Sequence, residues 1–339
     1  MITEQNEQVF RFNHLFFQKK AQKNFQETIL SFKKILRSFL IFNFIFISVI
    51  FCQIVSFAIL FSFLTSSLTL SVILASFFLT VFSYFILFFY FQGKKTDQLT
   101  VLKERFLENC RRALNLPQGA AEHHLSVALA ALKLKETISE SFNKENKSFF
   151  HSYLFKIILA VHKDDLFIFQ EKLLISSIEE HIKQLRFTPT DLEVHASLAN
   201  AYTILTALYA SAKDSFFSKL KKSELAKKHL AALKSTIEEY KILNDYAPND
   251  PWIHLQLADS YKKINLKHSE LKEYETAYKL CPNDNNILYK LGVLYFEMGK
   301  NSKGLRIYEE LKSRNYQNSE KLLSYYGLIK SQELLEDTL

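Results

Sequence analysis

Hydrophobic positions divide this chain into one uninterrupted apolar tract and two amphipathic flanks. From Ser38 to Gly93 there is no Asp, Glu, Lys, Arg or His, whereas charged residues are frequent on both sides. As one helix the tract would be roughly 84 Å long, but the apolar core of a bilayer is only about 30 Å thick. We therefore predict a transmembrane helical hairpin over 38–93 that turns at Thr65-Ser66-Ser67, with spans at about 39–64 and 68–91.

Basic residues flank both ends of this tract. Residues 1–37 hold seven basic and three acidic side chains, and residues 94–112 hold six and three. The Thr65–Ser67 turn carries no charge, so the positive-inside rule places both termini in the cytoplasm. The sequence thus predicts an integral membrane protein with two spans, in an inner membrane or a host-derived membrane.

Apolar residues also follow helical spacing before the first span. Within residues 1–37 and just beyond, the apolar positions are Phe25, Ile29, Phe32, Leu36 and Phe39, with basic residues around them. This pattern is typical of a basic amphipathic helix on a membrane surface. We expect it to lie on the cytoplasmic surface and to continue into the first span.

The chain after the hairpin is predicted to be all-α. Six glycines and five prolines in 339 residues leave little material for hairpin turns or phosphate-binding loops. In the region 94–190 we expect helices over about 98–115, 119–142, 147–162 and 165–187, which could be degenerate repeats. A capping Asp191 after Pro189 then introduces a last region, 191–339.

Two segments near the C-terminus share a period of 34 residues. With Pro251 and Asn285 as first positions, both have Leu at position 7, a small residue at 8 and Tyr at 11 and 24. The small residues let paired helices approach closely, and the aromatic residues fill the space between neighbours. Glu270 departs from this pattern, because it occupies position 20, where the second segment has Gly304.

These residues resemble the tetratricopeptide repeat family, whose helix-turn-helix unit has this period. The resemblance implies an α-solenoid of helix pairs, closed by a capping helix after Ser319. A distorted earlier unit between His195 and Pro248 fits an elongated helical hairpin hinged near 212–216.

Members of this family bind partners chiefly on the concave face, lined by the first helix of each pair. The corresponding positions here are Trp252, Leu255, Asp259, Lys262, Lys263, Asn286, Tyr289, Val293, Phe296 and Glu297. The resemblance therefore implies a surface for a protein or peptide with an apolar character and a few charged contacts. The alternative is that Trp252 and Phe296 only pack against neighbouring helices.

No motif of catalysis or metal binding is found. The adjacent His123 and His124 diverge by about 100° on a helix and cannot easily share a metal, and His162 beside Asp164 and Asp165 fits a solvated helix end. The three cysteines are isolated in sequence. We predict no enzyme, no cofactor and no metal.

We also predict no nucleic-acid partner, because the excess positive charge lies beside the hairpin and not on the repeats.

Three functions remain open. The first is a membrane-anchored scaffold or adaptor that binds proteins on the cytosolic side. The second is a secreted effector, because the bilobed apolar tract resembles the inclusion-membrane proteins of obligate intracellular bacteria in hydropathy. The third is a channel or transport subunit, although the amides Asn43 and Gln53 are better suited to interhelical hydrogen bonds than to an ion path.

Overall fold

The computed structural model describes residues 14–60, 67–114, 116, 121–145, 163–213 and 219–326. The chain forms two compact units, Met1–Phe187 and Thr188–Leu339. Every element of regular secondary structure in the described ranges is a helix, which confirms the all-α prediction.

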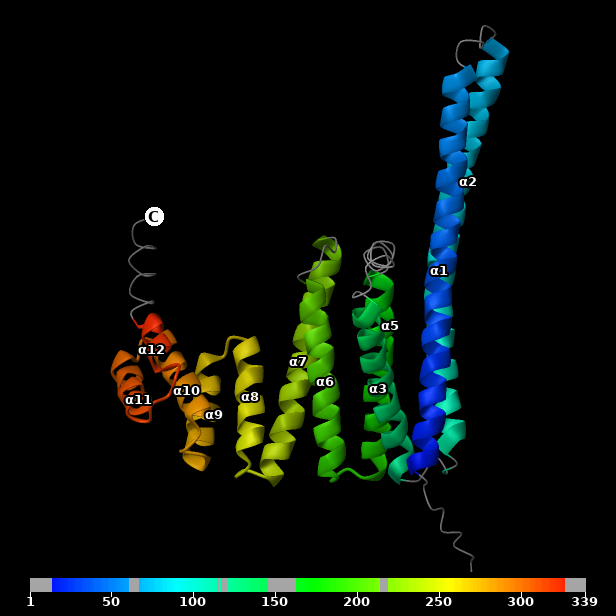
Figure 1. Ribbon diagram of the computed structural model, residues 1–339. Coiled ribbons are helices and arrows are strands. Elements are labelled where there is room, and N and C mark those ends of the chain that lie inside the picture. The colour runs from blue at the N-terminus through cyan, green and yellow to red at the C-terminus, as the bar shows by residue number, and fades with distance from the viewer. Residues whose placement is uncertain are drawn as a thin grey trace, which may run out of the picture. The chain divides into compact units, whose positions relative to one another are not determined.

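Two long helices lie side by side in the first unit (Figure 1). Helix α1 spans His14–Leu60 and α2 spans Ser67–Leu114, so the two predicted spans lie on separate helices. Residues 61–66, which include most of the predicted turn, lie outside the described part of the chain. Both helices are long and apolar enough to cross a membrane.

Each of these helices is longer than its predicted span. Helix α1 runs from the basic flank into the apolar tract without interruption, as expected. Helix α2 also continues past Gly93, where we expected a break before residue 98. One glycine lowers the stability of a helix by only about 1 kcal/mol relative to alanine. No proline follows Gly93 before Leu114, so nothing in this stretch ends the helix.

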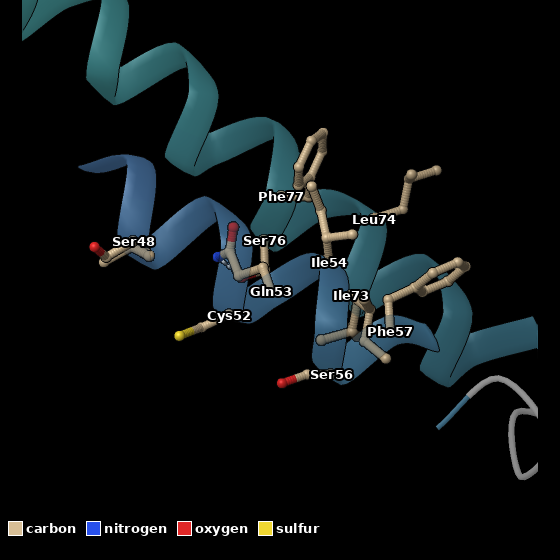
Figure 2. Close-up of a pocket in the computed structure, with 12 residues that line it drawn as sticks. Ser48, Cys52, Gln53, Ile54, Ser56, Phe57, Ile73, Leu74, Ser76 and Phe77 are labelled. Carbon is tan, nitrogen blue, oxygen red and sulfur yellow. Dashed lines mark hydrogen bonds between the residues drawn. The ribbon is translucent and has the colours of Figure 1, made fainter. Parts of the chain in front are cut away.

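Polar side chains join α1 and α2 within the apolar tract. The Gln53 amide donates from Nε2 to Thr80 Oγ1 at 2.8 Å, and the Tyr84 hydroxyl donates to Asn43 Oδ1 at 2.9 Å. These bonds confirm the interhelical role expected for the two amides. In Figure 2, Gln53 and Ser76 lie between the helices, beside a cavity of about 740 Å³ whose described lining residues include no ionisable carboxylate, amine, guanidinium or imidazole.

The core of the first unit lies beside the charged halves of α1 and α2. Helices α3 (Ala121–Glu145) and α5 (Lys163–Phe187) pack there, close to the predicted segments 119–142 and 165–187. Phe32 is fully buried and stacks on Phe169 with ring centroids 4.8 Å apart. The predicted helix over 147–162 lies outside the described residues.

This core changes the interpretation of the N-terminal amphipathic helix. Ile29, Phe32, Leu36 and Phe39 are buried against protein, where we expected them on a membrane surface. The expectation of membrane contact for this face was wrong, because aromatic and aliphatic residues of α2, α3 and α5 cover it first. Burial against protein and insertion into lipid both remove apolar area from water, so one sequence pattern fits both.

The second unit begins with an elongated pair of antiparallel helices (Figure 1). Helix α6 spans Leu192–Lys213 and α7 spans Lys219–Tyr246. The predicted hinge near 212–216 therefore begins at the end of α6, and residues 214–218 lie outside the described part of the chain.

Two shorter helix pairs follow, and they confirm the tetratricopeptide-like prediction. The first pair is α8 (Pro251–Lys263) with α9 (Lys267–Leu280), and the second is α10 (Asn285–Glu297) with α11 (Asn301–Ser313). The expected cap consists of α12 (Ser319–Leu322) and the 3₁₀ helix η2 (Leu323–Tyr325). Leu322 is fully buried in the second pair's core, so the cap closes its apolar end.

Backbone geometry repeats with the same period of 34 residues. Asn265 and Gly299 hold equivalent positions between paired helices and have φ of 58° and 70°. This left-handed conformation ends a helix and suits Gly and Asn. The next residues close equivalent hydrogen bonds, from Leu266 N to Tyr261 O at 3.0 Å and from Lys300 N to Tyr295 O at 2.8 Å.

A Pro-x-Asp sequence precedes the first helix of all three pairs. Asp191, Asp250 and Asp284 each follow a proline by two residues. Each carboxylate accepts a hydrogen bond from the backbone N–H two residues later, at 3.0, 2.9 and 2.8 Å respectively. These bonds satisfy donors that the helix leaves free, so α6, α8 and α10 begin at fixed positions.

Candidate partner-binding surface

The predicted binding residues lie on α8 and α10, but their exposure differs. Trp252, Asp259, Lys262, Lys263 and Asn286 are exposed. Leu255, Tyr289, Val293 and Glu297 are half-buried, and Leu255, Tyr289 and Val293 pack against one core cluster. The two helices therefore carry a row of exposed and half-buried apolar groups with charged residues beside them.

Phe296 does not belong to this accessible row. Only 1% of it is exposed, and its ring lies where a side chain on Gly304 would be, 2.6 Å from an ideal Cβ at that glycine. Phe296 therefore fills the contact between α10 and α11. Its assignment to a partner-binding surface is wrong for this structure, because the missing side chain of Gly304 admits the ring.

Trp252 combines a packing role with free surface. Its indole meets the Tyr240 ring edge to face, with centroids 5.8 Å apart, yet 47% of the residue is exposed. Trp252 thus packs on a neighbouring helix, as the alternative expected, but with only part of its side chain. The remaining surface is available to a partner.

Tyr289 is held in place by the end of the second repeat. Its ring centroid lies 5.9 Å from that of Tyr316, and the Tyr316 hydroxyl donates to Asn286 Oδ1 at 3.0 Å. Burial raises the pKa of the Tyr289 hydroxyl above the ordinary tyrosine value. These contacts make Tyr289 a positioned aromatic group with a hydroxyl donor.

Charged side chains beside the row are arranged in pairs. Lys263 Nζ lies 2.6 Å from Asp259 Oδ2, one turn earlier on α8. Glu270, on α9, is buried, and burial raises the pKa of its carboxyl while the Lys262 charge lowers it. Both lysines therefore already interact with acidic residues.

Two histidines, His195 and His254, join the helices of their pairs through contacts that were not predicted from the sequence. His254 Nδ1 lies 2.7 Å from Glu273 Oε2, and its Nε2 lies 2.9 Å from the Pro248 carbonyl oxygen. His195 makes the same contacts with Glu239 and Pro189, at 2.7 and 3.0 Å. Histidine at position 4 with glutamate on the second helix was the available signal.

The α10–α11 pair lacks this arrangement. Position 4 is Leu288, which is buried in the apolar core of the pair, and the Pro282 carbonyl accepts from Arg314 at 3.0 Å instead. Each proline carbonyl is thus satisfied by a side chain from the repeat that follows it. The histidines serve a structural role, since an apolar residue takes their place in an otherwise equivalent repeat.

A buried carboxylate joins three helices of the first unit. Glu180 of α5 accepts from Arg111 at 2.9 Å, from Lys183 at 2.8 Å, and contacts His124 Nδ1 at 2.7 Å. Burial raises its pKa, but the hydrogen bonds from Lys183, His124 and Arg111 outweigh burial and lower the pKa to about 2. His124 therefore pairs with Glu180, and no group of three potential metal ligands occurs among the described residues.

Comparison with known proteins gives only distant structural similarity. No family model and no curated protein matches the sequence. A human IFIT1 dimer with m7Gppp-AAAA superposes with a TM-score of 0.34 and 15% identity, over 74% of this chain and 64% of that one. This chain therefore spans less than two thirds of IFIT1.

Two other solved structures are named for tetratricopeptide repeats. A thermophilic TPR protein of Thermus thermophilus has a TM-score of 0.30 and 22% identity, over 61% of this chain and 94% of that one. The TPR2AB domain of yeast Sti1 in complex with pHSP90 has a TM-score of 0.25 and 14% identity, over 70% and 93%. Such superpositions assign no function, and the repeat architecture rests on the helix pairs described above.

Proposed function

We propose that this protein is a membrane-anchored scaffold whose helical repeats recruit a protein or peptide. The anchor is the α1–α2 hairpin, in an inner or host-derived membrane, with both termini on the cytoplasmic side. The recruiting surface is the row on α8 and α10 formed by Trp252, Leu255, Asp259, Lys262, Lys263, Asn286, Tyr289, Val293 and Glu297.

The observation that supports the anchor is apolar surface that no other described part of the chain covers. In the most apolar window of α1 only 6% of residues are buried, and in that of α2 none are. Ile47, Phe51, Phe78 and Phe82 are among the exposed side chains. A core helix of a soluble protein would have such side chains covered, whereas a lipid bilayer provides the apolar surroundings that they lack here.

We expect reporter fusions to give opposite locations for the N-terminus and the hairpin turn. A reporter active only in the cytoplasm should be active at Met1 and inactive after Ser66, because the flanks carry the positive charge. A fusion after Asn283, between two repeats, is the control and should behave like the N-terminal fusion. Equal activity at Met1 and Ser66 would contradict the hairpin topology.

The recruiting surface is proposed because its aromatic residues are fixed yet accessible. Trp252 and Tyr289 each pack against one tyrosine and retain surface for a partner. Pre-positioned aromatic side chains lose little conformational freedom on binding and dominate many interfaces. The small apolar row suits one face of an amphipathic helix or an extended peptide.

We expect the double variant Trp252→Ala/Tyr289→Ala to lose its partner. Removal of two central aromatic residues should reduce recovery on the order of 10-fold or more in affinity capture with the detergent-solubilised full-length protein. Tyr246→Ala is the matched control, because Tyr246 is an exposed aromatic residue at the end of α7. Equal recovery by the double variant and the control would exclude this row as the binding surface.

A further inference from the structure

A basic stripe lies on α1 at the boundary between its charged and apolar halves. Lys33, Lys34 and Arg37 line a hollow of about 560 Å³, together with Leu30, Ser38 and Ile41. Arg37 is the last charged residue before the uncharged tract. The hollow thus runs from cationic side chains onto residues of the predicted first span.

This stripe lies on a different face of α1 from the protein core. Phe32, Leu36 and Phe39 are buried, whereas Lys34 and Arg37 are exposed. Lys33 is half-buried, and its Nζ lies 5.7 Å from the centroid of the Phe142 ring, so α3 holds this cation at the edge of the core. The core therefore orients the stripe outward.

The charges of Lys34 and Arg37 are not balanced by acidic residues on α1. Between Glu27 and the end of α1 the sequence has no Asp or Glu, and Glu27 lies 3.9 Å from Lys23. Asp165, a buried carboxylate of α5, is bonded to Lys95 at 2.8 Å. Within the described residues no ion pair is found for Lys34 or Arg37, so both cations remain available for an anion.

We propose that Lys34 and Arg37, beside Lys33, bind the headgroup phosphate of an anionic phospholipid at this end of the first span. A guanidinium and an ammonium group match a phosphate in charge and hydrogen bonding. Ile41, which is 53% exposed, continues the hollow into the apolar tract and contacts the lipid's acyl chain. This inference rests on the proposed membrane anchoring and adds a lipid preference to it.

The test is lipid binding by the full-length protein in a nonionic detergent, measured by native mass spectrometry. We expect phosphatidylglycerol to bind on the order of 10-fold better than phosphatidylcholine with the same acyl chains. The variant Lys34→Gln/Arg37→Gln should lose this preference. The charge-preserving variant Lys34→Arg/Arg37→Lys should retain it, and far-UV circular dichroism confirms that each variant is folded.

Control variants and ligands separate the other outcomes. Lys272→Gln/Lys279→Gln removes the same charge from exposed positions on α9 and should bind phosphatidylglycerol normally. Soluble glycerophosphoglycerol at the same concentration should not displace the lipid, since it lacks acyl chains. The proposal would be overturned if the wild-type protein bound both lipids equally, or if Lys34→Gln/Arg37→Gln bound phosphatidylglycerol as well as the wild type. The stripe would then have a role in membrane topology alone.

Failure of the anchor itself would give a different result. Extraction of the wild-type protein from membranes by alkaline carbonate would contradict the proposed anchoring, and this inference would fall with it. Retention after carbonate without a preference for phosphatidylglycerol would contradict the lipid site alone.

Discussion

Replacing Phe296 by alanine is expected to lower the free energy of unfolding of the repeats by about 3–5 kcal/mol. The ring is almost completely buried against Gly304, whose missing side chain cannot fill the cavity left behind. Domains are stable by only about 5–15 kcal/mol, so this loss is a large part of the total. Trp252 is the only tryptophan, and its fluorescence during guanidinium unfolding reports on the repeats.

Tyr289→Ala is the control for this prediction. Tyr289 lies on the same helix as Phe296 but is half-buried, so we expect a loss of about 1 kcal/mol or less. The two variants should therefore separate stability from binding. A Phe296→Ala protein as stable as Tyr289→Ala would contradict the core position of Phe296.

Phe296 also shows where the sequence was insufficient. The period of 34 residues predicted the helix pairs because small and aromatic positions recur in both. Position 12, however, holds Phe296 opposite Gly304 in one repeat and Lys262 near Glu270 in the other. The residues at positions 12 and 20 thus differ together between the two repeats, and the family pattern alone does not include that dependence.

The hairpin was predictable because an uncharged tract of this length has few alternative structures. The packing of other helices against its charged end was not predictable. Lys95 was counted among the basic flanking residues, yet it is buried, bonded to Asp165 and placed 4.2 Å from the centroid of the Phe39 ring. These three residues are distant in sequence, and only the packing of α1, α2 and α5 brings them together. Part of the flanking charge therefore lies inside the protein core.

Glu180→Gln is expected to weaken the first unit by about 3 kcal/mol at pH 7. The Glu180 side chain is 2% exposed, and its pKa is lowered from 4.5 to about 2 in the folded chain. Each unit of pKa difference corresponds to about 1.4 kcal/mol. Because the folded pKa lies below the unfolded value, this contribution is present above pH 4.5 and declines as the pH falls towards 2.

Hydrogen exchange of the α5 amides, read by mass spectrometry, measures this effect in the unit concerned. Glu179→Gln is the matched control, because Glu179 is the adjacent residue and is exposed. Comparing both variants with wild type at equal pH cancels the intrinsic pH dependence of exchange. The difference between Glu180→Gln and wild type should fall from about 3 kcal/mol at pH 7 to about 1 kcal/mol at pH 3. A difference that stays constant over this range would show that Glu180 acts through its shape and hydrogen bonds and not through its charge.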